Sequence, residues 1–137
     1  IEAGCDGITV HLEADHNVAE TLDRIRAAGC KVGLAINPDT PIEDTIPYLP
    51  QIDLLLVMTV HPGFGGQAFM TQVMPKIEKA IQLRTQQNLN FHIQVDGGID
   101  PTTTTIAAKA GANSFVAGSS TFKAPDMAQA ITNIRNA

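Results

Sequence analysis

Short apolar runs alternate with amphipathic segments along most of the chain. The runs predict five β-strands, at Gly7–Leu12, Lys31–Ile36, Leu54–Val60, Phe91–Val95 and Ser114–Ala117. Their starts lie about 23 residues apart, except for a wider gap between the third and the fourth. Consecutive apolar positions, as in LLLVM, are typical of a parallel sheet that is covered on both faces. The pattern therefore predicts parallel strands joined by helices.

Helix-start signals stand between these strands. Asn17 and Asp100 are expected to cap helices through their side chains, Pro75 is expected to open the longest helix, and the last helix is expected to start near Asp126. The stretch Thr40–Glu43 has the spacing of a capping box with proline at the first helical position. The last helix is expected to bury an apolar stripe, formed by Met127, Ala130, Ile131 and Ile134.

Glycines mark the helix ends. Gly4, Gly29 and Gly111 each follow an alanine at the expected end of a helix and precede the next apolar run. A left-handed residue ends many helices, and glycine adopts that conformation without strain. The chain therefore has the organisation of a βα repeat.

Repeated βα units build either a doubly wound open sheet or an eight-stranded barrel, and periodicity alone does not choose between them. The 137 residues suffice for one domain, with no linker or low-complexity tract. Five parallel strands cannot close a barrel of eight. If the fold is a barrel, we expect residues 1–137 to form a single partial domain whose first three βα units lie ahead of Ile1.

Composition narrows the possible partners. The net charge is −5 and the basic residues are scattered, which counts against nucleic acid as a partner. No apolar run approaches the ~20 residues that span a bilayer, so we expect no membrane partner. Cys5 and Cys30 are interpreted as small buried residues of a reduced, cytoplasmic protein.

The residues after the third apolar run are rich in glycine. Gly63, Gly65 and Gly66 lie within the segment HPGFGGQ, residues 61–67. In βα folds, ligands bind at the carboxyl-terminal ends of the strands. The segment is either a ligand-binding loop whose amides approach a ligand closely or a wide turn that tolerates glycine.

Two further strand ends carry candidate chemistry. Asp96 ends the fourth run and is followed by Gly97 and Gly98, and Gly118 and Ser119 follow the fifth run. The loops after the last two strands of a barrel, with the N-terminus of a short extra helix, form a recurrent phosphate site. Together the two signals indicate a phosphate-binding site beside a carboxylate.

Other polar residues have simpler interpretations. His61 is expected to shape the loop rather than take part in chemistry, and His11 is expected to be a hydrogen-bonded histidine in the core. No pair of histidines has the spacing of metal ligands. Met58 is either a core residue or a lining residue of the ligand site.

Three stretches resemble the ribulose-phosphate 3-epimerase family. They are LLVMTVHPGFGGQAF at 55–69, VDGGI at 95–99 and AGANSFVAGSSTF at 110–122, and the likeness extends over all 137 residues. The resemblance implies an α/β fold of the TIM (β/α)8 barrel type, of which this chain covers about strands 4–8. It also implies an isomerase of the pentose phosphate pathway that interconverts D-ribulose 5-phosphate and D-xylulose 5-phosphate.

The resemblance assigns roles by position. Asp96 is implied as the acid/base that exchanges the C3 proton with a second acid on the opposite face. Met58 is implied to cover the reacting centre, and the glycine-rich loop is implied to be mobile. The remaining residues implied to contact substrate or phosphate are Gly63, Gly65, Gly66, Gly97, Gly98, Gly118 and Ser119.

The resemblance also implies a divalent metal, commonly zinc, with iron, manganese or cobalt as alternatives, and Asp96 as one ligand. The family's other metal ligands and its second acid come from strands that these residues do not include. We therefore expect the 137-residue chain by itself to bind metal poorly and not to epimerise. A full-length form is expected to be a homo-oligomer acting on a phosphorylated pentose.

Two other functions remain open. One is a related epimerase that acts on a ketohexose 6-phosphate, since related barrels share the phosphate site and vary the sugar pocket. The other is a non-catalytic fragment that binds phosphate.

Overall fold

A computed structural model describes all residues from Ile1 to Ala137. Its centre is one sheet of five parallel strands, β1 (Gly7–His11), β2 (Lys31–Ile36), β3 (Leu54–Met58), β4 (His92–Asp96) and β5 (Ser114–Val116), which confirms the five predicted strands with small shifts at their ends. The helices are α1 (Val18–Ala27), α2 (Met74–Gln86), α3 (Pro101–Ala110), α4 (Ser119–Phe122) and α5 (Met127–Arg135). Three short 3-10 segments are η1 (Ile42–Thr45), η2 (Leu49–Gln51) and η3 (Thr71–Val73).

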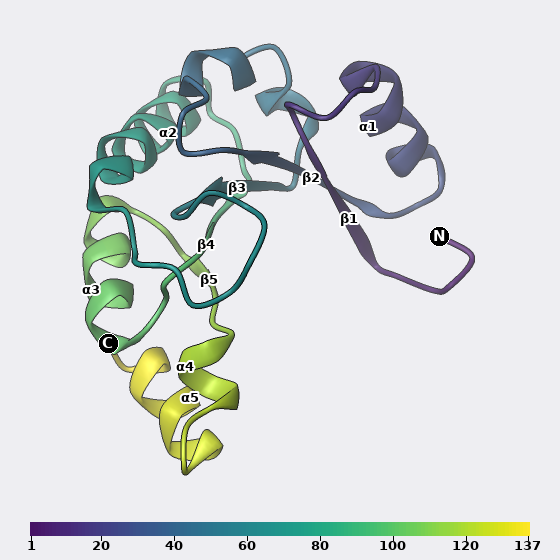
Figure 1. Cartoon of the computed structure of the whole chain (residues 1–137). Helices are drawn as coiled ribbons and strands as arrows, with labels where there is room; N and C mark the ends of the chain where they lie inside the picture. The colour runs from purple at the N-terminus through teal and green to yellow at the C-terminus, as the bar shows by residue number, and fades with distance from the viewer.

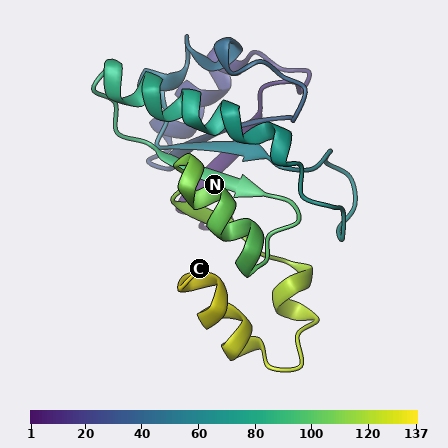
Figure 2. The same cartoon turned by 90° about the vertical axis from the view of Figure 1, so that its left-hand side faces the viewer.

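The strands follow one another across the sheet in the order of the sequence, from β1 to β5. A doubly wound sheet reverses its strand order at a switch point, whereas a barrel does not. Figure 2 shows α2 and α3 together over one face of the sheet. The sequential order and the one-sided helices are those of a segment of a (β/α)8 barrel.

The core lies between the sheet and these helices. Alternate strand residues such as Leu55, Val57, Ile93 and Val95 are fully buried there, together with Ile77 of α2. Because successive strand side chains point to opposite faces, the residues between them face the other side of the sheet. Gln94 and Asp96 are on that other side and are only half-buried. The face that carries Asp96 is therefore the face without helices.

Local helix signals are mostly confirmed. The side chains of Asn17, Asp100 and Asp126 accept hydrogen bonds from backbone N–H groups at the starts of α1, α3 and α5, and Pro75 lies in the first turn of α2. Gly29 and Gly111 have left-handed backbone conformations, with φ of 80° and 117°. Propensity and capping therefore fix most element boundaries.

The capping-box prediction at Thr40 is wrong. The segment forms the 3-10 turn η1, which has no side-chain cap. The Thr40 hydroxyl instead donates to the carboxylate of Glu13, which lies 27 residues earlier. The hydrogen bond to Glu13 uses the hydroxyl that a local helix cap would need.

Three burial predictions are also wrong. Helix α5 lies beside α4 and away from the sheet (Figure 1), and Met127 and Ile131 are 48% and 40% exposed. Cys5 is exposed and Cys30 is half-buried, and both are free thiols. The ring of His11 is 37% exposed, because it faces the side of the sheet without helices. An amphipathic pattern reports which face of an element is apolar, but not whether anything covers it.

Candidate functional site

Asp96 is the last residue of β4 and lies between Met58 and Val116 of the neighbouring strands in the sheet register. No hydrogen bond or ion pair reaches its carboxylate. Burial disfavours the charged form, so the pKa of Asp96 is raised above its ordinary value. The carboxyl group is therefore both free to meet a ligand and easier to protonate than an aspartate in water.

The turn after Asp96 requires both of its glycines. Gly97 and Gly98 have φ of 123° and 65°. A β-carbon on Gly97 would lie 2.5 Å from the side chain of Val60, and one on Gly98 would lie 2.6 Å from the backbone nitrogen of Phe69. The turn is consequently packed against both ends of the segment that carries the glycine-rich loop.

The turn after β5 lies beside the turn after β4. Gly118 immediately precedes α4, and no atom lies within 4 Å of the position of a β-carbon there. The Ser120 hydroxyl donates to the carbonyl of Ile99, which ties this turn to the one after β4. The helix α4, which follows Gly118, is the short extra helix that barrels carry after a late strand.

The glycine loop, residues 61–67, extends from the end of β3 toward the turn after β5. The amide of Gln67 donates to the carbonyls of His61 (2.7 Å) and Phe64 (2.9 Å) and so holds the loop in shape. A β-carbon on Gly65 would come within 3.9 Å of the Ser119 hydroxyl. Figure 2 shows the loop beyond the same end of the strands as α4.

These segments surround one cavity of about 670 Å³, a size typical of small-ligand sites. All nine residues proposed from the sequence line it, namely Met58, Gly63, Gly65, Gly66, Asp96, Gly97, Gly98, Gly118 and Ser119. No lysine or arginine lines it. An anion would therefore be held by backbone N–H groups and hydroxyls rather than by a basic side chain.

Pattern analysis missed several residues of the cavity. Phe64, Phe69 and Thr103 line it, and the Thr103 hydroxyl donates to the carbonyl of Gly98 at 2.8 Å. The only sequence signal for Thr103 was its place three residues after the cap Asp100, where it completes a capping box. His61 does not line the cavity and lies 3.7 Å from the exposed carboxylate of Asp39.

The residues present do not form a metal site. No group of three or more histidine, cysteine, aspartate or glutamate side chains is placed to hold a metal ion. Asp96 and Asp100 are the only carboxylates in the cavity, and Asp100 caps α3. A divalent metal takes at least four ligands. The 137 residues therefore do not fit a divalent ion by themselves.

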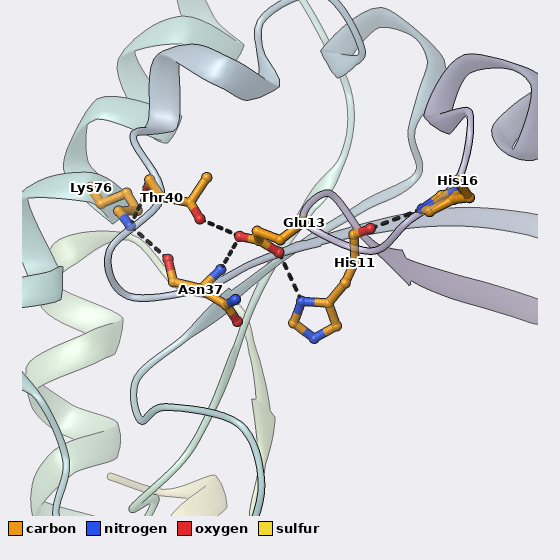
Figure 3. A network of polar contacts seen from close by, with 6 residues as sticks. All are labelled: His11, Glu13, His16, Asn37, Thr40 and Lys76. Atoms are coloured by element: carbon orange, nitrogen blue, oxygen red, sulfur yellow. Dashed lines mark hydrogen bonds and ion pairs between the residues drawn. The ribbon is translucent and has the colours of Figure 1, made fainter.

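A second set of polar residues lies at the ends of β1 and β2, outside this cavity. Figure 3 shows this polar cluster, formed by His11, Glu13, His16, Asn37, Thr40 and Lys76. The carboxylate of Glu13 accepts hydrogen bonds from the backbone N–H of Asn37 (2.7 Å), the Thr40 hydroxyl and the ring of His11 (3.1 Å). The ammonium of Lys76 donates to three carbonyls, those of Asn37 (3.0 Å), Pro38 (2.9 Å) and Thr40 (2.5 Å).

The ionisable groups of the polar cluster are already partnered. Burial is the largest single influence on Glu13 and would raise its pKa, but the hydrogen bonds from Asn37, Thr40 and His11 together lower it. Burial lowers the pKa of Lys76, and nearby carboxylates oppose this effect. Because its charged groups are satisfied within the protein, the polar cluster is suited to holding the loop after β2 rather than to binding a ligand.

Solved structures share the fold. The chain superposes on 3-hexulose-6-phosphate synthase with a TM-score of 0.72 at 22% sequence identity, over 98% of this chain and 63% of that one. This likeness confirms the barrel segment. No helix of the structure is long and apolar enough to cross a membrane.

Comparison with protein families and curated proteins identifies the relatives. The model of the ribulose-phosphate 3-epimerase family matches residues 1–122. Ribulose-phosphate 3-epimerase of Synechocystis sp. is 45% identical over 137 residues, and that of Mycobacterium tuberculosis is 42% identical over 134 residues. Each match covers 98% of this chain, but the chain spans only 60% and 58% of those two proteins. The chain belongs to the ribulose-phosphate 3-epimerase family.

Proposed function

We propose that this chain supplies the phosphate site and one proton-transfer group of an epimerase that interconverts D-ribulose 5-phosphate and D-xylulose 5-phosphate. The position of Asp96 in the cavity supports this proposal most directly. Its unpartnered carboxyl group shares one cavity with the glycine turns after β4 and β5.

The epimerase reaction needs a carboxyl group that can take up and release a proton, and Asp96 has the properties of such a group. Inversion at C3 requires that a proton leave from one face of the sugar and another return on the opposite face, so two acids serve it best. Burial raises the pKa of Asp96 and so brings it closer to a neutral pH. A carboxylate with a higher pKa is a better proton acceptor. The buried Met58 on the neighbouring strand helps to keep water away from the carboxyl group.

The phosphate end of the substrate fits the other half of the cavity. Gly97, Gly98, Gly118 and Ser119 offer backbone N–H groups without bulky side chains. Such groups hold a phosphate without a basic residue. With the phosphate at these turns and C3 near Asp96, the glycine loop would cover the carbon backbone of the sugar.

The family's divalent metal would stabilise the enediolate, but the present residues supply Asp96 alone as a free ligand. We propose that the 137-residue protein binds phosphate but does not turn over D-ribulose 5-phosphate, even with added zinc. Measurable turnover by this protein would contradict that part of the proposal.

We also propose that the protein acts in the cytoplasm, where its free thiols would stay reduced.

A chimera tests the reaction itself. Residues 1–137 would replace the matching 60% of the Synechocystis relative. The chimera should epimerise D-ribulose 5-phosphate, and Asp96→Asn should lower its turnover by about 10²–10⁴-fold, the usual contribution of a positioned acid or base.

Asp100→Asn is the matched control, because Asp100 lines the same cavity and asparagine caps a helix as well as aspartate does. The control should keep its activity. Equal loss in both variants would contradict the role of Asp96. Faster turnover of a ketohexose 6-phosphate would assign the related hexose epimerase, and phosphate binding without turnover would assign a non-catalytic phosphate-binding protein.

A further inference from the structure

Thr59 is the first residue after β3 and is fully buried. Its backbone N–H donates to the carbonyl of Asp96 at 2.8 Å. Its hydroxyl lies 2.9 Å from the same carbonyl and 2.7 Å from the carbonyl of Gly97. One buried side chain thus contacts the two consecutive peptide groups that follow the carboxyl-bearing residue.

The direction of these carbonyls determines the direction of the next two amides. In a planar trans peptide, the C=O of one residue and the N–H of the following residue point in opposite directions. A donor that holds the Asp96 and Gly97 carbonyls therefore also sets where the N–H groups of Gly97 and Gly98 point. Those are the amides of the turn that lines the cavity.

The same residue lies at the base of the glycine loop. The N–H of Met70 donates to the carbonyl of Thr59 at 2.9 Å, which closes the segment that contains the loop. Val60 and Phe69, at the two ends of that segment, pack against Gly97 and Gly98. Thr59 is therefore bonded to the loop on one side and to the turn on the other.

We propose that Thr59 is a positioning residue, whose N–H and hydroxyl together orient the Gly97 and Gly98 amides toward a bound phosphate and hold the Asp96 backbone in register with the glycine loop. The Asp96 carbonyl is held by both donors, whereas the Gly97 carbonyl, and with it the Gly98 amide, is held by the hydroxyl alone. The proposal rests on the proposed function, because it gives these amides a phosphate to bind. A buried hydroxyl that only satisfied its own hydrogen-bonding capacity would have no such effect.

Thr45 provides a matched control. It is also fully buried, and its hydroxyl donates to a single carbonyl, that of Ile42, at 2.6 Å. Thr45 does not line the cavity. Thr45→Val and Thr59→Val remove the same group and keep the same shape, so both should lower the stability of the protein.

The experiment measures the orientation of the amides directly in the 137-residue protein. Residual dipolar couplings of the Gly98 N–H group, recorded without phosphate, should change in Thr59→Val and stay the same in Thr59→Ser and Thr45→Val. The Gly97 coupling should change less in Thr59→Val, because the Thr59 N–H still holds the Asp96 carbonyl. Inorganic phosphate should bind Thr59→Val about tenfold more weakly, equivalent to about 1.4 kcal/mol. Thr59→Ser should bind it like the parent protein.

Unchanged couplings and unchanged phosphate affinity in Thr59→Val would overturn the proposal. Changed couplings in Thr59→Ser would also overturn it, because serine keeps the hydroxyl. If Thr59→Val does not fold, Thr59→Cys replaces the hydroxyl with a weaker donor of similar size and should change the Gly98 coupling in the same direction by a smaller amount. A parent protein that binds no phosphate would refute the proposed function alone, since the couplings are measured without phosphate.

Discussion

Two carboxylates lie at strand ends on the same edge of the sheet and have opposite surroundings. Glu13, two residues beyond β1, accepts three hydrogen bonds from neighbouring groups, and its pKa is lowered. Asp96, at the end of β4, accepts none, and burial raises its pKa. Both positions satisfy the rule that βα proteins bind ligands at the carboxyl ends of strands. A carboxylate at a strand end is therefore a candidate for ligand binding when, as at Asp96, neighbouring groups leave it without hydrogen bonds.

The backbone around the two carboxylates differs in the same way. Beside Glu13, the carbonyls of the loop after β2 are held by Lys76. Beside Asp96, glycine turns line an open cavity that contains no basic side chain. The charged groups of the polar cluster are bonded within the protein, although the buried side-chain oxygen of Asn37 has no partner, whereas the cavity keeps a carboxyl group available. Substitutions in both regions test this division, and the first has the largest expected effect.

Gly98→Ala should damage the cavity most. A β-carbon there would meet the Phe69 backbone nitrogen at 2.6 Å, and φ is 65°. Overpacking costs about 1–3 kcal/mol, and a left-handed non-glycine residue costs roughly 1–2 kcal/mol more. We expect loss of phosphate binding, measured by NMR titration, together with a lower free energy of unfolding.

Gly29→Ala is the control for this change. Gly29 has a φ of 80° and no atom within 4 Å of a β-carbon position. Gly29→Ala should therefore lower the free energy of unfolding only by the cost of a left-handed alanine, and it should leave phosphate binding intact. Equal phosphate affinity in Gly98→Ala and the parent would contradict the assignment of the turn.

Lys76→Met should destabilise the polar cluster without affecting the cavity. The change leaves three loop carbonyls without their donor. An unsatisfied buried acceptor costs about 1–3 kcal/mol, and these carbonyls are only part-buried, so we expect a loss near the lower end of that range, which urea unfolding would measure. Lys79→Met, on the exposed side of the same helix, should be nearly neutral. Weaker phosphate binding in Lys76→Met would show that the two regions are coupled.

The sequence predicts the parts of this division that depend on local signals. Two-sided apolar runs locate the strands, Asn17 and Asp100 cap helices as expected, and the last helix starts beside Asp126 as expected. Glycines after β3, β4 and β5 point to the cavity because a barrel places successive strand ends side by side. Each of these signals lies within a few residues of the feature that it predicts.

The rest depends on contacts that are distant in sequence. Thr59 bonds to residues 37 and 38 positions later, and Lys76 bonds to carbonyls 36 to 39 positions earlier. No spacing rule connects such residues before the fold is known. The failure at Thr40 has the same origin, because Glu13 competes with a local cap for its hydroxyl.

The two carboxylates should give opposite pH dependences of stability. Asp96 has a raised pKa, so its contribution is present below its unfolded pKa of about 4 and is lost as the pH rises through the folded value. Asp96→Asn should therefore be more stable than the parent at pH 7, and this advantage should vanish in acid.

For Glu13 the sign is reversed. Its pKa is lowered, so its contribution is present above an unfolded pKa of about 4 and is lost as the pH falls through the folded value. Glu13→Gln should be less stable than the parent at pH 7 and should approach it in acid. Urea unfolding of both variants across this pH range measures the two slopes, and slopes of the same sign would refute the contrast.

His61→Ala should have the smallest effect, although His61 is where the glycine loop meets the loop after β2. Its ring lies 3.7 Å from Asp39, and the two side chains are 56% and 83% exposed. Exposed pairs of this kind contribute between about 0 and 1 kcal/mol. Gln67 holds the loop through the carbonyls of His61 and Phe64, so replacing the imidazole leaves the backbone of the loop restrained. Phosphate affinity should therefore stay unchanged in His61→Ala and fall in Gln67→Ala. The reverse result would mean that contact with Asp39 in the loop after β2, rather than bonding within the glycine loop, shapes the cavity.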